Sequence, residues 1–194
     1  MSKRTIALYG GSFNPPHAAH QLVACYVLAT QPVDELWFVP TYSHPFGKPL
    51  APYEDRVEMC KRVAAMFARE PAVRVSLAER ALAKRPGFVA SRTLDLVDYL
   101  RAREPAATFR LVIGADILAE TDKWYRWDEL MKRAPAIVVG RSGVALPKRV
   151  TVTGVAMPAI SGTEIRKRLG QGREVAGLLP TSVLRYIRSR KLYQ

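Results

Sequence analysis

Two histidines follow two glycines near the start of the chain, in the stretch YGGSFNPPHAAH at residues 9–20. An apolar run precedes the glycines and apolar residues at helical spacing follow them, which predicts a strand, a glycine turn and a helix. Glycines at such a turn admit a ligand close to the backbone, and the first amides of a helix have no partner within it. Because such a helix start attracts phosphate, we expect Gly10, Gly11 and Ser12 to bind a phosphate group.

His17 and His20 lie three residues apart, so we expect both side chains to project from the same side of the helix start, with Pro16 in its first turn. An imidazole there can donate a hydrogen bond to a phosphoryl oxygen and, when protonated, offset developing negative charge. Capping or packing of the helix is the alternative for either histidine. The glycine pair directly before them favours a role with the ligand.

Other site types are excluded by spacing. No Gly-x-x-x-x-Gly-Lys-Ser/Thr occurs, and no third glycine of a dinucleotide fingerprint follows the first two, which argues against both common phosphate motifs. His-x-x-His lacks the glutamate and the spacing of metalloprotease helices, so we expect no metal held by the protein itself.

A second anion site is predicted near the other end of the chain, at Ser161-Gly162-Thr163-Glu164. Ser161 and Glu164 form a capping box that starts a helix at Thr163, and Gly162 allows a close approach to the backbone. This helix start presents amides to an anion, and Arg166, one turn on, adds a fork-shaped cation. An ordinary capped helix is the alternative, but it needs no arginine at that position.

The two motifs resemble the signatures of a known superfamily. Residues 10–20 resemble Gly-x-Phe-Asp-Pro-x-His-x-Gly-His of the nucleotidylyltransferases, and residues 160–166, Ile-Ser-Gly-Thr-Glu-Ile-Arg, resemble their Ile-Ser-Ser-Thr-x-Ile-Arg. The double glycine and the second motif are most similar to the nicotinate mononucleotide adenylyltransferase family. The resemblance implies a single nucleotidylyltransferase domain over residues 1–194 that transfers an adenylyl group from ATP to nicotinate mononucleotide, giving deamido-NAD and pyrophosphate.

The resemblance also implies roles for the residues of both motifs. His17, His20 and Arg166 would be catalytic. Gly10 to Ser12 and Ser161 to Thr163 would bind ATP and its phosphates. Mg²⁺ is implied as a cofactor that is held mainly by the substrate phosphates and water. Catalysis would then consist of positioning and charge stabilisation, with no protein nucleophile.

Four further residues resemble the mononucleotide-binding positions of the family. Thr93, in Ser91-Arg92-Thr93-Leu94-Asp95, matches a threonine whose amide helps hold the nicotinate carboxylate. Trp124 matches a tryptophan that stacks on the pyridine ring, and Tyr125 supplies the next amide. Asp116 matches a residue at the nucleoside sites, and its place just past a predicted parallel strand also suits a contact with a ribose hydroxyl. A helix cap is the alternative for Asp116.

A phosphate contact is carried over to Lys48, in the proline-rich loop of residues 41–52, with an exposed surface lysine as the alternative. The sequence departs from the family pattern at four positions. Asn14 stands for the usual Asp, Ala19 for Gly, Arg92 for Tyr and Gly162 for Ser. None of these changes removes the backbone amides on which the two anion sites depend.

Hydrophobic periodicity predicts alternating strands and helices, and hence an α/β fold: a single Rossmann-like, doubly wound parallel sheet with helices on both faces and C-terminal helices. The predicted strands are 5–9, 35–40, 73–77, 108–113, 136–140 and 150–153. The predicted helices are 16–30, 53–67, 91–103 with Ser91 as N-cap, a helix from 163, and 183–193. Residues 78–90 read as a basic, turn-rich connection, and Trp127 as a core residue.

Composition is compatible with this fold. The chain has 194 residues, of which 48% are hydrophobic and 24% charged, which is typical of a globular domain. No apolar run is long enough to cross a bilayer and no signal segment opens the chain, so we expect a cytoplasmic protein with no membrane partner. Cys25 and Cys60 form no Cys-x-x-Cys, and we expect reduced thiols in the core.

The net charge of +13 favours polyanionic partners. The basic residues are dispersed and no recognised nucleic-acid module surrounds them, so triphosphate substrates are favoured over nucleic acid. Two alternatives stay open at this point. One is a related nucleotidylyltransferase with another phosphorylated acceptor, because Arg92 and residues 44–48 differ from the family. The other is a basic nucleic-acid-binding module that has the fold without the activity.

Overall fold

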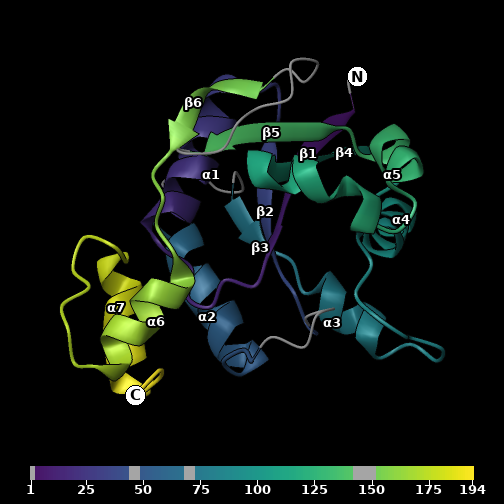
Figure 1. The fold of residues 1–194 in the computed structure, drawn as a ribbon. Coiled ribbons are helices and arrows are strands. Elements are labelled where there is room, and N and C mark those ends of the chain that lie inside the picture. Colours follow the sequence, from purple (N-terminus) through teal and green to yellow (C-terminus); the bar gives the residue numbers. More distant parts are fainter. Residues whose placement is uncertain (1–2, 44–48, 68–72, 142–151) are drawn as a thin grey trace.

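The computed structural model of the chain describes residues 3–43, 49–67, 73–141 and 152–194. Within these ranges a parallel sheet has the strand order β3-β2-β1-β4-β5-β6 (Figure 1). Its strands are β1 (Arg4–Gly11), β2 (Glu35–Pro40), β3 (Val73–Val75), β4 (Ala107–Gly114), β5 (Ala136–Arg141) and β6 (Val152–Met157). This is the order of a doubly wound Rossmann-like sheet, and it confirms the predicted fold class.

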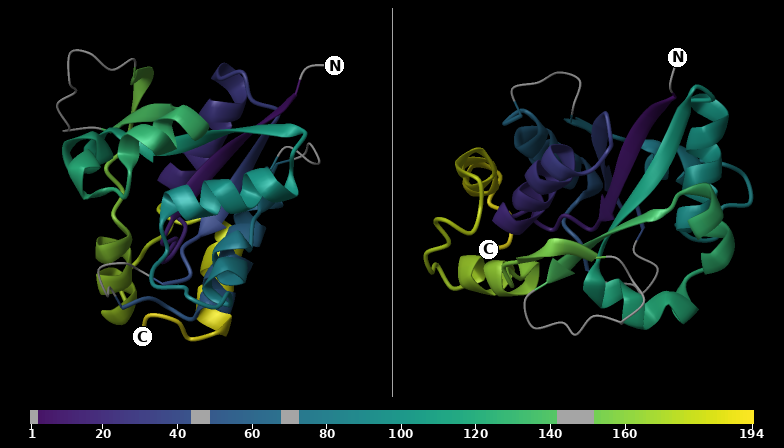
Figure 2. Two further views of the ribbon diagram at one scale, coloured as in Figure 1. Left: turned by 90° about the vertical axis from the view of Figure 1, so that its right-hand side faces the viewer. Right: turned by 90° about the horizontal axis from the view of Figure 1, so that it is seen from above.

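Helices cover both faces of the sheet (Figure 2). They are α1 (Ala18–Thr30), α2 (Tyr53–Ala64), α3 (Ala78–Ala83), α4 (Thr93–Arg103), η1 (Ala115–Lys123, a 3₁₀ helix), α5 (Trp127–Arg133), α6 (Gly162–Gly170) and α7 (Thr181–Ser189). Alternate strand residues enter two separate hydrophobic clusters, because successive side chains of a strand point to opposite faces. Ala7 and Phe38 pack with α1, α2 and the C-terminal helices, whereas Leu8 and Val39 pack with α4 and α5.

The C-terminal helix α7 packs against α2, near the carboxyl ends of the strands (Figure 1). Asp55 of α2, which is buried, accepts hydrogen bonds from the Tyr186 hydroxyl at 2.7 Å and from Arg190 Nε at 3.3 Å. Two donors satisfy this carboxylate, so its burial is compatible with stability. The last helix is thereby fixed to the first half of the chain.

Several predicted boundaries are wrong. Helix α1 begins at Ala18, after Pro16, with His17 as its N-cap. The N-cap of α4 is Arg92 and not Ser91. Residues 78–90, predicted to be a turn-rich connection, contain α3. Cys60 is buried as expected, but Cys25 is exposed, because it lies on the outer side of α1.

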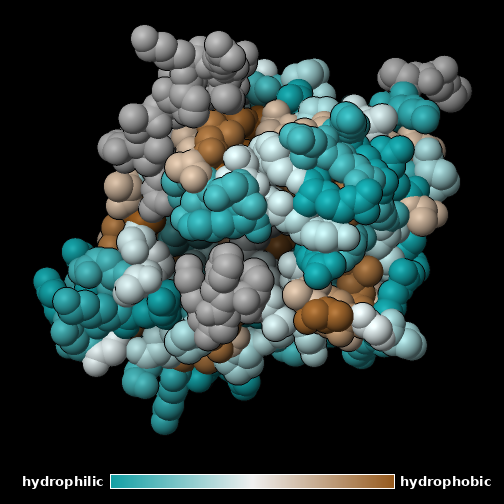
Figure 3. Space-filling model, turned by 45° about the vertical axis from the view of Figure 1, so that its right-hand side comes forward, coloured by the Kyte–Doolittle hydropathy of each residue, from teal (hydrophilic) through white to brown (hydrophobic). Residues whose placement is uncertain are grey.

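The surface carries hydrophilic side chains over most of the face in Figure 3, with apolar residues in small separate groups between them. The large exposed apolar residues of the described ranges come from different elements: Leu22, Tyr42, Met66, Val89, Tyr125 and Val155. Such scattered residues are normal for a globular surface. No helix in the described part of the chain is long and apolar enough to cross a membrane.

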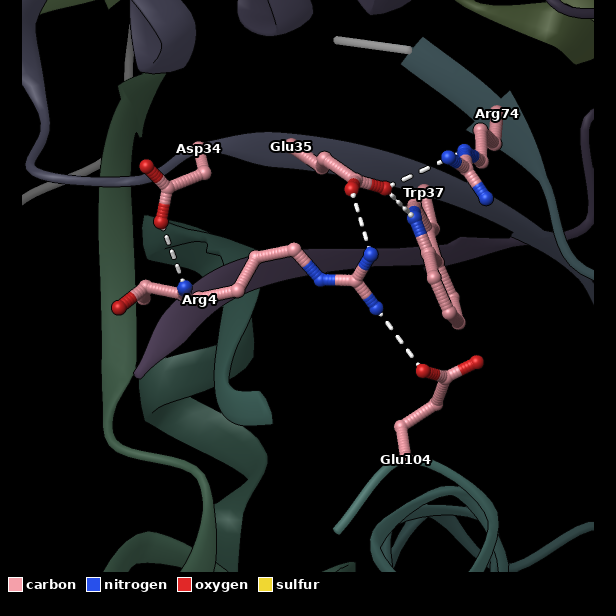
Figure 4. A network of polar contacts seen from close by, with 7 residues as sticks. Arg4, Asp34, Glu35, Trp37, Arg74 and Glu104 are labelled. Atoms are coloured by element: carbon pink, nitrogen blue, oxygen red, sulfur yellow. Dashed lines mark hydrogen bonds and ion pairs between the residues drawn. The ribbon is translucent and has the colours of Figure 1, made fainter. Parts of the chain in front are cut away.

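A buried carboxylate stabilises the amino end of the sheet. Glu35, which is 3% exposed, lies between two arginines from neighbouring strands (Figure 4). Its oxygens lie 3.1 Å from Arg4 and 3.3 Å from Arg74, and the Trp37 indole donates to it at 2.7 Å. Three donors replace the water that this carboxylate loses on burial.

We expect Glu35→Gln to lower the free energy of unfolding by about 2 kcal/mol. This loss lies between those measured for exposed and for buried ion pairs, because Glu35 is buried while both of its arginine partners are partly exposed. Urea denaturation measures this loss. Glu104→Gln is the matched control, since Glu104 also pairs with Arg4 but is itself partly exposed. Equal losses in the two variants would contradict a special role for the buried carboxylate.

Candidate active site

A cavity of about 700 Å³ opens at the carboxyl edge of the sheet. Its walls come from the ends of β1, β4, β5 and β6, from the starts of α1 and α4, and from η1. The strand order reverses between β1 and β4, and ligands of open α/β sheets bind at such a point. Eleven of the predicted site residues line the cavity: Gly10, Gly11, Ser12, His17, His20, Thr93, Asp116, Trp124, Tyr125, Ser161 and Gly162.

The remaining predicted site residues have other positions. Lys48 lies outside the described residues. Thr163 and Arg166 are among the described residues but do not line the cavity. They follow Gly162 on α6, one and four residues further along the helix. Arg166 donates from Nη1 to the backbone carbonyl of Asn14 at 2.8 Å and from Nη2 to Thr163 Oγ1 at 3.2 Å. Its guanidinium thus joins the second motif to the first.

The two glycines of the first motif meet different surroundings. A Cβ on Gly10 would meet no atom within 4 Å, whereas a Cβ on Gly11 would lie 3.1 Å from the Phe13 ring. Gly10 therefore borders open space where a ligand can approach, and Gly11 makes room for Phe13. Phe13 has a positive φ of 45°, a costly backbone conformation that persists only where the surroundings fix it. Its ring packs edge-on against Tyr9 and Phe38.

The two histidines form the start of α1 as a unit. The backbone amide of His17 donates to His20 Nδ1 at 3.0 Å, and the two rings are stacked with centroids 3.7 Å apart. This hydrogen bond assigns the ring proton of neutral His20 to Nε2, because Nδ1 acts as the acceptor. Helix capping by His20 is therefore compatible with the predicted role with the ligand, because the ring proton then lies on Nε2.

The second motif adopts the predicted capped helix. Ser161 is the N-cap of α6, its hydroxyl accepts from the Glu164 amide at 3.5 Å, and the helix begins at Gly162, one residue before the predicted start. Glu164 does not reach back to complete the box, because its carboxylate binds Arg168 at 2.9 Å. Ser161 and Gly162 therefore place the start of α6 on the cavity wall next to the first motif, where a Cβ on Gly162 would lie 3.4 Å from the Asn14 carbonyl oxygen.

Two buried polar residues that support the first motif were missed by sequence analysis. Arg56, 1% exposed, donates to the backbone carbonyls of Ser12 at 2.9 Å and of Ala51 at 3.0 Å. Asn14, 6% exposed, binds residues 49–51 with its side chain. Arg56 lies on the apolar stripe of α2, four residues before Cys60 and seven before Val63, and a charge on such a stripe is the signal that could have revealed it.

The opposite wall holds the residues expected to bind the mononucleotide. Thr93 is the first residue of α4, so its amide has no partner within the helix. Trp124 stacks edge-on against Trp127 with centroids 5.6 Å apart, and Trp127 packs into the core as predicted. The Arg92 guanidinium lies 4.2 Å from the centre of the Tyr125 ring. The two side chains together form one stacked pair at the cavity wall.

Asp116 lies in the first turn of η1, where Gly114 is the N-cap. The simple N-cap alternative for Asp116 is therefore wrong. Its carboxylate folds back over Gly114, where a Cβ would overlap it. A side chain at position 114 would displace this carboxylate, so the glycine keeps Asp116 on the cavity wall.

Glu79 of α3 is the buried carboxyl group of this cavity, with 8% of its surface exposed. Burial raises the pKa of Glu79 above its usual 4.5. The polar groups of Ser91 and of the Tyr42 backbone, together with the Arg56 charge, oppose only part of that rise. Burial dominates because it removes solvation from the charged form.

The family model and the known proteins that this chain matches agree with one another. Residues 8–168 match the cytidylyltransferase-like family. A protein of Anaeromyxobacter dehalogenans (strain 2CP-C), named "Probable nicotinate-nucleotide adenylyltransferase", is 52% identical over 98% of this chain and 97% of its own length. A protein of Myxococcus xanthus with the same name is 36% identical over 97% of this chain and 94% of its own length.

A solved structure supports the fold. The chain is similar to "Plasmodium falciparum nicotinic acid mononucleotide adenylyltransferase complexed with NaAD", with a TM-score of 0.79, 19% identity, and coverage of 98% of this chain and 97% of that one. At this identity the likeness concerns the fold alone.

We expect Glu79→Gln to change how stability depends on pH. Because folding raises the pKa of Glu79, its contribution to stability is present below pH 4.5 and is lost as the pH rises through the folded-state pKa. The glutamine variant should lack this loss, so its stability relative to the parent protein should increase with pH above 4.5. Urea denaturation at several pH values measures the difference. Glu54→Gln, at a side chain that is 70% exposed, is the control, and identical pH profiles for both variants would contradict the assignment.

Proposed function

We propose the function that follows from one premise: the chain belongs to the cytidylyltransferase-like family and, within it, to the nicotinate-nucleotide adenylyltransferases. It transfers the adenylyl group of ATP to nicotinate mononucleotide, giving deamido-NAD and pyrophosphate. The observation that carries the proposal is the meeting of two helix starts on one cavity wall, joined by the 2.8 Å hydrogen bond from Arg166 to Asn14.

The two helix starts divide the triphosphate between them. Gly10, Gly11 and Ser12 receive the reacting α-phosphate, since Gly10 borders open space and the start of α1 favours an anion. Ser161 and Gly162 at the start of α6 receive the β- and γ-phosphates. The Arg166 guanidinium, which is planar and always charged, lies directly behind Gly162 and stabilises the departing pyrophosphate.

The reaction is an in-line displacement at the α-phosphorus. A phosphate oxygen of the mononucleotide forms a new bond to this phosphorus, and the bond to the β-phosphate bridging oxygen breaks with release of pyrophosphate. The Nε2–H of His20 donates to a non-bridging oxygen as negative charge develops there. The stacked His17 ring fixes the plane of His20. The residues position the two substrates and stabilise charge, and none forms a covalent bond with them.

Mg²⁺ fits this arrangement as an ion that enters with ATP. No group of three or more His, Cys, Asp or Glu side chains that could hold a metal ion occurs among the described residues. Mg²⁺ commonly keeps several waters and binds substrate phosphates. When bound, it neutralises phosphate charge in the transition state.

The acceptor binds on the opposite wall. The Thr93 amide at the start of α4 and the amide of Tyr125 hold the nicotinate carboxylate, and the Trp124 ring stacks on the pyridine. Asp116 reaches a ribose hydroxyl from the end of β4. The roles of these residues favour the acid over the amide form of the mononucleotide, because amides donate to a carboxylate and a helix start attracts negative charge.

Pyrophosphate release from ATP and Mg²⁺ tests the reaction, with nicotinate mononucleotide and nicotinamide mononucleotide as separate acceptors. We expect turnover with the acid form to exceed turnover with the amide form, and deamido-NAD to be identified as the product. Activity with neither acceptor would contradict the proposed function.

We expect His20→Ala and Arg166→Ala each to lower kcat by about 100-fold or more, the usual cost of removing a donor that stabilises transition-state charge. Leu22→Ala is the matched control on α1, at a side chain that is 46% exposed. The folded state of each variant is checked by circular dichroism. A folded variant that keeps the parental kcat would remove that residue from the mechanism.

A further inference from the structure

Tyr193 connects the C-terminal segment to the first motif. Its hydroxyl donates to Asn14 Oδ1 at 2.9 Å, although the two residues are 179 positions apart in sequence. The Tyr193 ring packs against the hydrophobic cluster that α1, α2 and α7 share. Tyr193 is thus held by its ring, and its hydroxyl reaches the loop between β1 and α1.

The side chain of Asn14 uses both the oxygen and the nitrogen of its amide in this contact and two others. Its Oδ1 accepts from the Ala51 amide at 3.0 Å as well as from Tyr193, and its Nδ2 donates to the Pro49 carbonyl at 3.3 Å. Because the Ala51 amide can only donate and the Pro49 carbonyl can only accept, this orientation of the Asn14 amide is the one that satisfies all partners. The loop of the first motif is therefore fixed from two sides.

The backbone of Asn14 carries this constraint to the second motif. Its carbonyl accepts from Arg166 Nη1 at 2.8 Å, and a Cβ on Gly162 would lie 3.4 Å from the same oxygen. The position of this carbonyl therefore sets where the guanidinium lies relative to the start of α6. A displacement of Asn14 moves Arg166 and the first motif together.

We propose that Tyr193 is a positioning residue for the adenylyl transfer described above: its hydroxyl fixes Asn14, whose carbonyl orients Arg166. The inference rests on the proposed function for its kinetic effect. Tyr193 itself does not line the cavity in the described part of the chain, so it acts through Asn14 and not on the substrates.

The properties of the hydroxyl suit this role. Burial raises the pKa of Tyr193, and the nearby Arg166 and Arg56 charges offset only part of that rise. The phenol therefore keeps its proton and stays a donor throughout the neutral range. Removal of the hydroxyl should not release the segment, because Tyr186 and Arg190 bind Asp55 independently.

Tyr193→Phe tests the proposal, with Tyr186→Phe as the matched control. We expect Tyr193→Phe to lower kcat by about tenfold with KM for the mononucleotide unchanged, because a small misplacement of a catalytic group is costly. Tyr186→Phe removes a hydrogen bond of similar length from the same segment and should lower the melting temperature while leaving kcat unchanged. A parental kcat in Tyr193→Phe, or an equal loss of kcat in both variants, would overturn the proposal.

A double-mutant cycle shows whether Tyr193 acts through Arg166. In an Arg166→Lys background, which keeps the charge but loses the forked geometry, we expect Tyr193→Phe to change kcat by less than about twofold. Independent effects would instead multiply, and the same tenfold loss in both backgrounds would exclude a route through Arg166.

Pyrophosphate binding, measured by calorimetry, separates this inference from the proposed function because it needs no acceptor. We expect Tyr193→Phe to weaken pyrophosphate binding severalfold relative to the parent protein and to Tyr186→Phe. If the parent protein does not use nicotinate mononucleotide, the proposed function fails while weaker pyrophosphate binding still supports the positioning role. Equal binding by all three proteins would overturn the positioning role.

Discussion

The hydrogen bond from Arg166 to the carbonyl of Asn14 is the contact on which the site depends. It spans 152 positions of sequence and brings together two helix starts that the sheet alone would not align. The sheet places the ends of β1 and β6 at one edge, but α6 follows β6 after an irregular connection. The position of α6 is therefore set by its contacts with the loop before α1 and with the C-terminal segment, so the tail of the chain belongs to the architecture of the site.

Buried polar groups do most of this positioning. Arg56 is almost fully buried and donates to two backbone carbonyls, so it fixes residues 12 and 51 relative to one another. Burial lowers the pKa of Arg56, but a guanidinium remains charged even then. Asp55, the next residue back on α2, faces the C-terminal helix instead. One helix turn therefore connects the first motif on one side and the C-terminal segment on the other.

The fold could be predicted from the sequence because it depends on patterns that are local. The strand of residues 35–40 is apolar from Leu36 onward and its predicted bounds match β2, since a strand buried on both faces needs no polar alternation. Glycine pairs and capping residues predicted two helix starts, and both of them line the cavity. Boundaries failed where a local rule competed with tertiary contacts. Pro16 suits a first helical turn, yet α1 begins after it, where the Leu178 carbonyl accepts the Ala18 amide at 2.9 Å.

The supporting shell of the site could not be predicted in the same way. Asn14, Arg56 and Tyr193 meet only in three dimensions, and no spacing within one element signals their contact. Glu79 was missed for a related reason, because α3 lies in a stretch whose proline, glycine and basic residues indicate a turn. A carboxyl group on a short helix there has no periodicity to mark it as buried.

The departures from the family signatures become coherent once these contacts are considered together. At position 14 an aspartate would direct a second oxygen at the Pro49 carbonyl, whereas the asparagine donates to it at 3.3 Å. At position 162 a Cβ would lie 3.4 Å from the Asn14 carbonyl oxygen and 3.5 Å from Arg166 Nη1, which is ordinary van der Waals contact, so glycine and the usual serine both fit between these two groups. Arg92 replaces a ring with another planar group and stacks on Tyr125. The changes at positions 14 and 92 are each matched by a neighbour in this chain, and the residues at both helix starts still line the cavity.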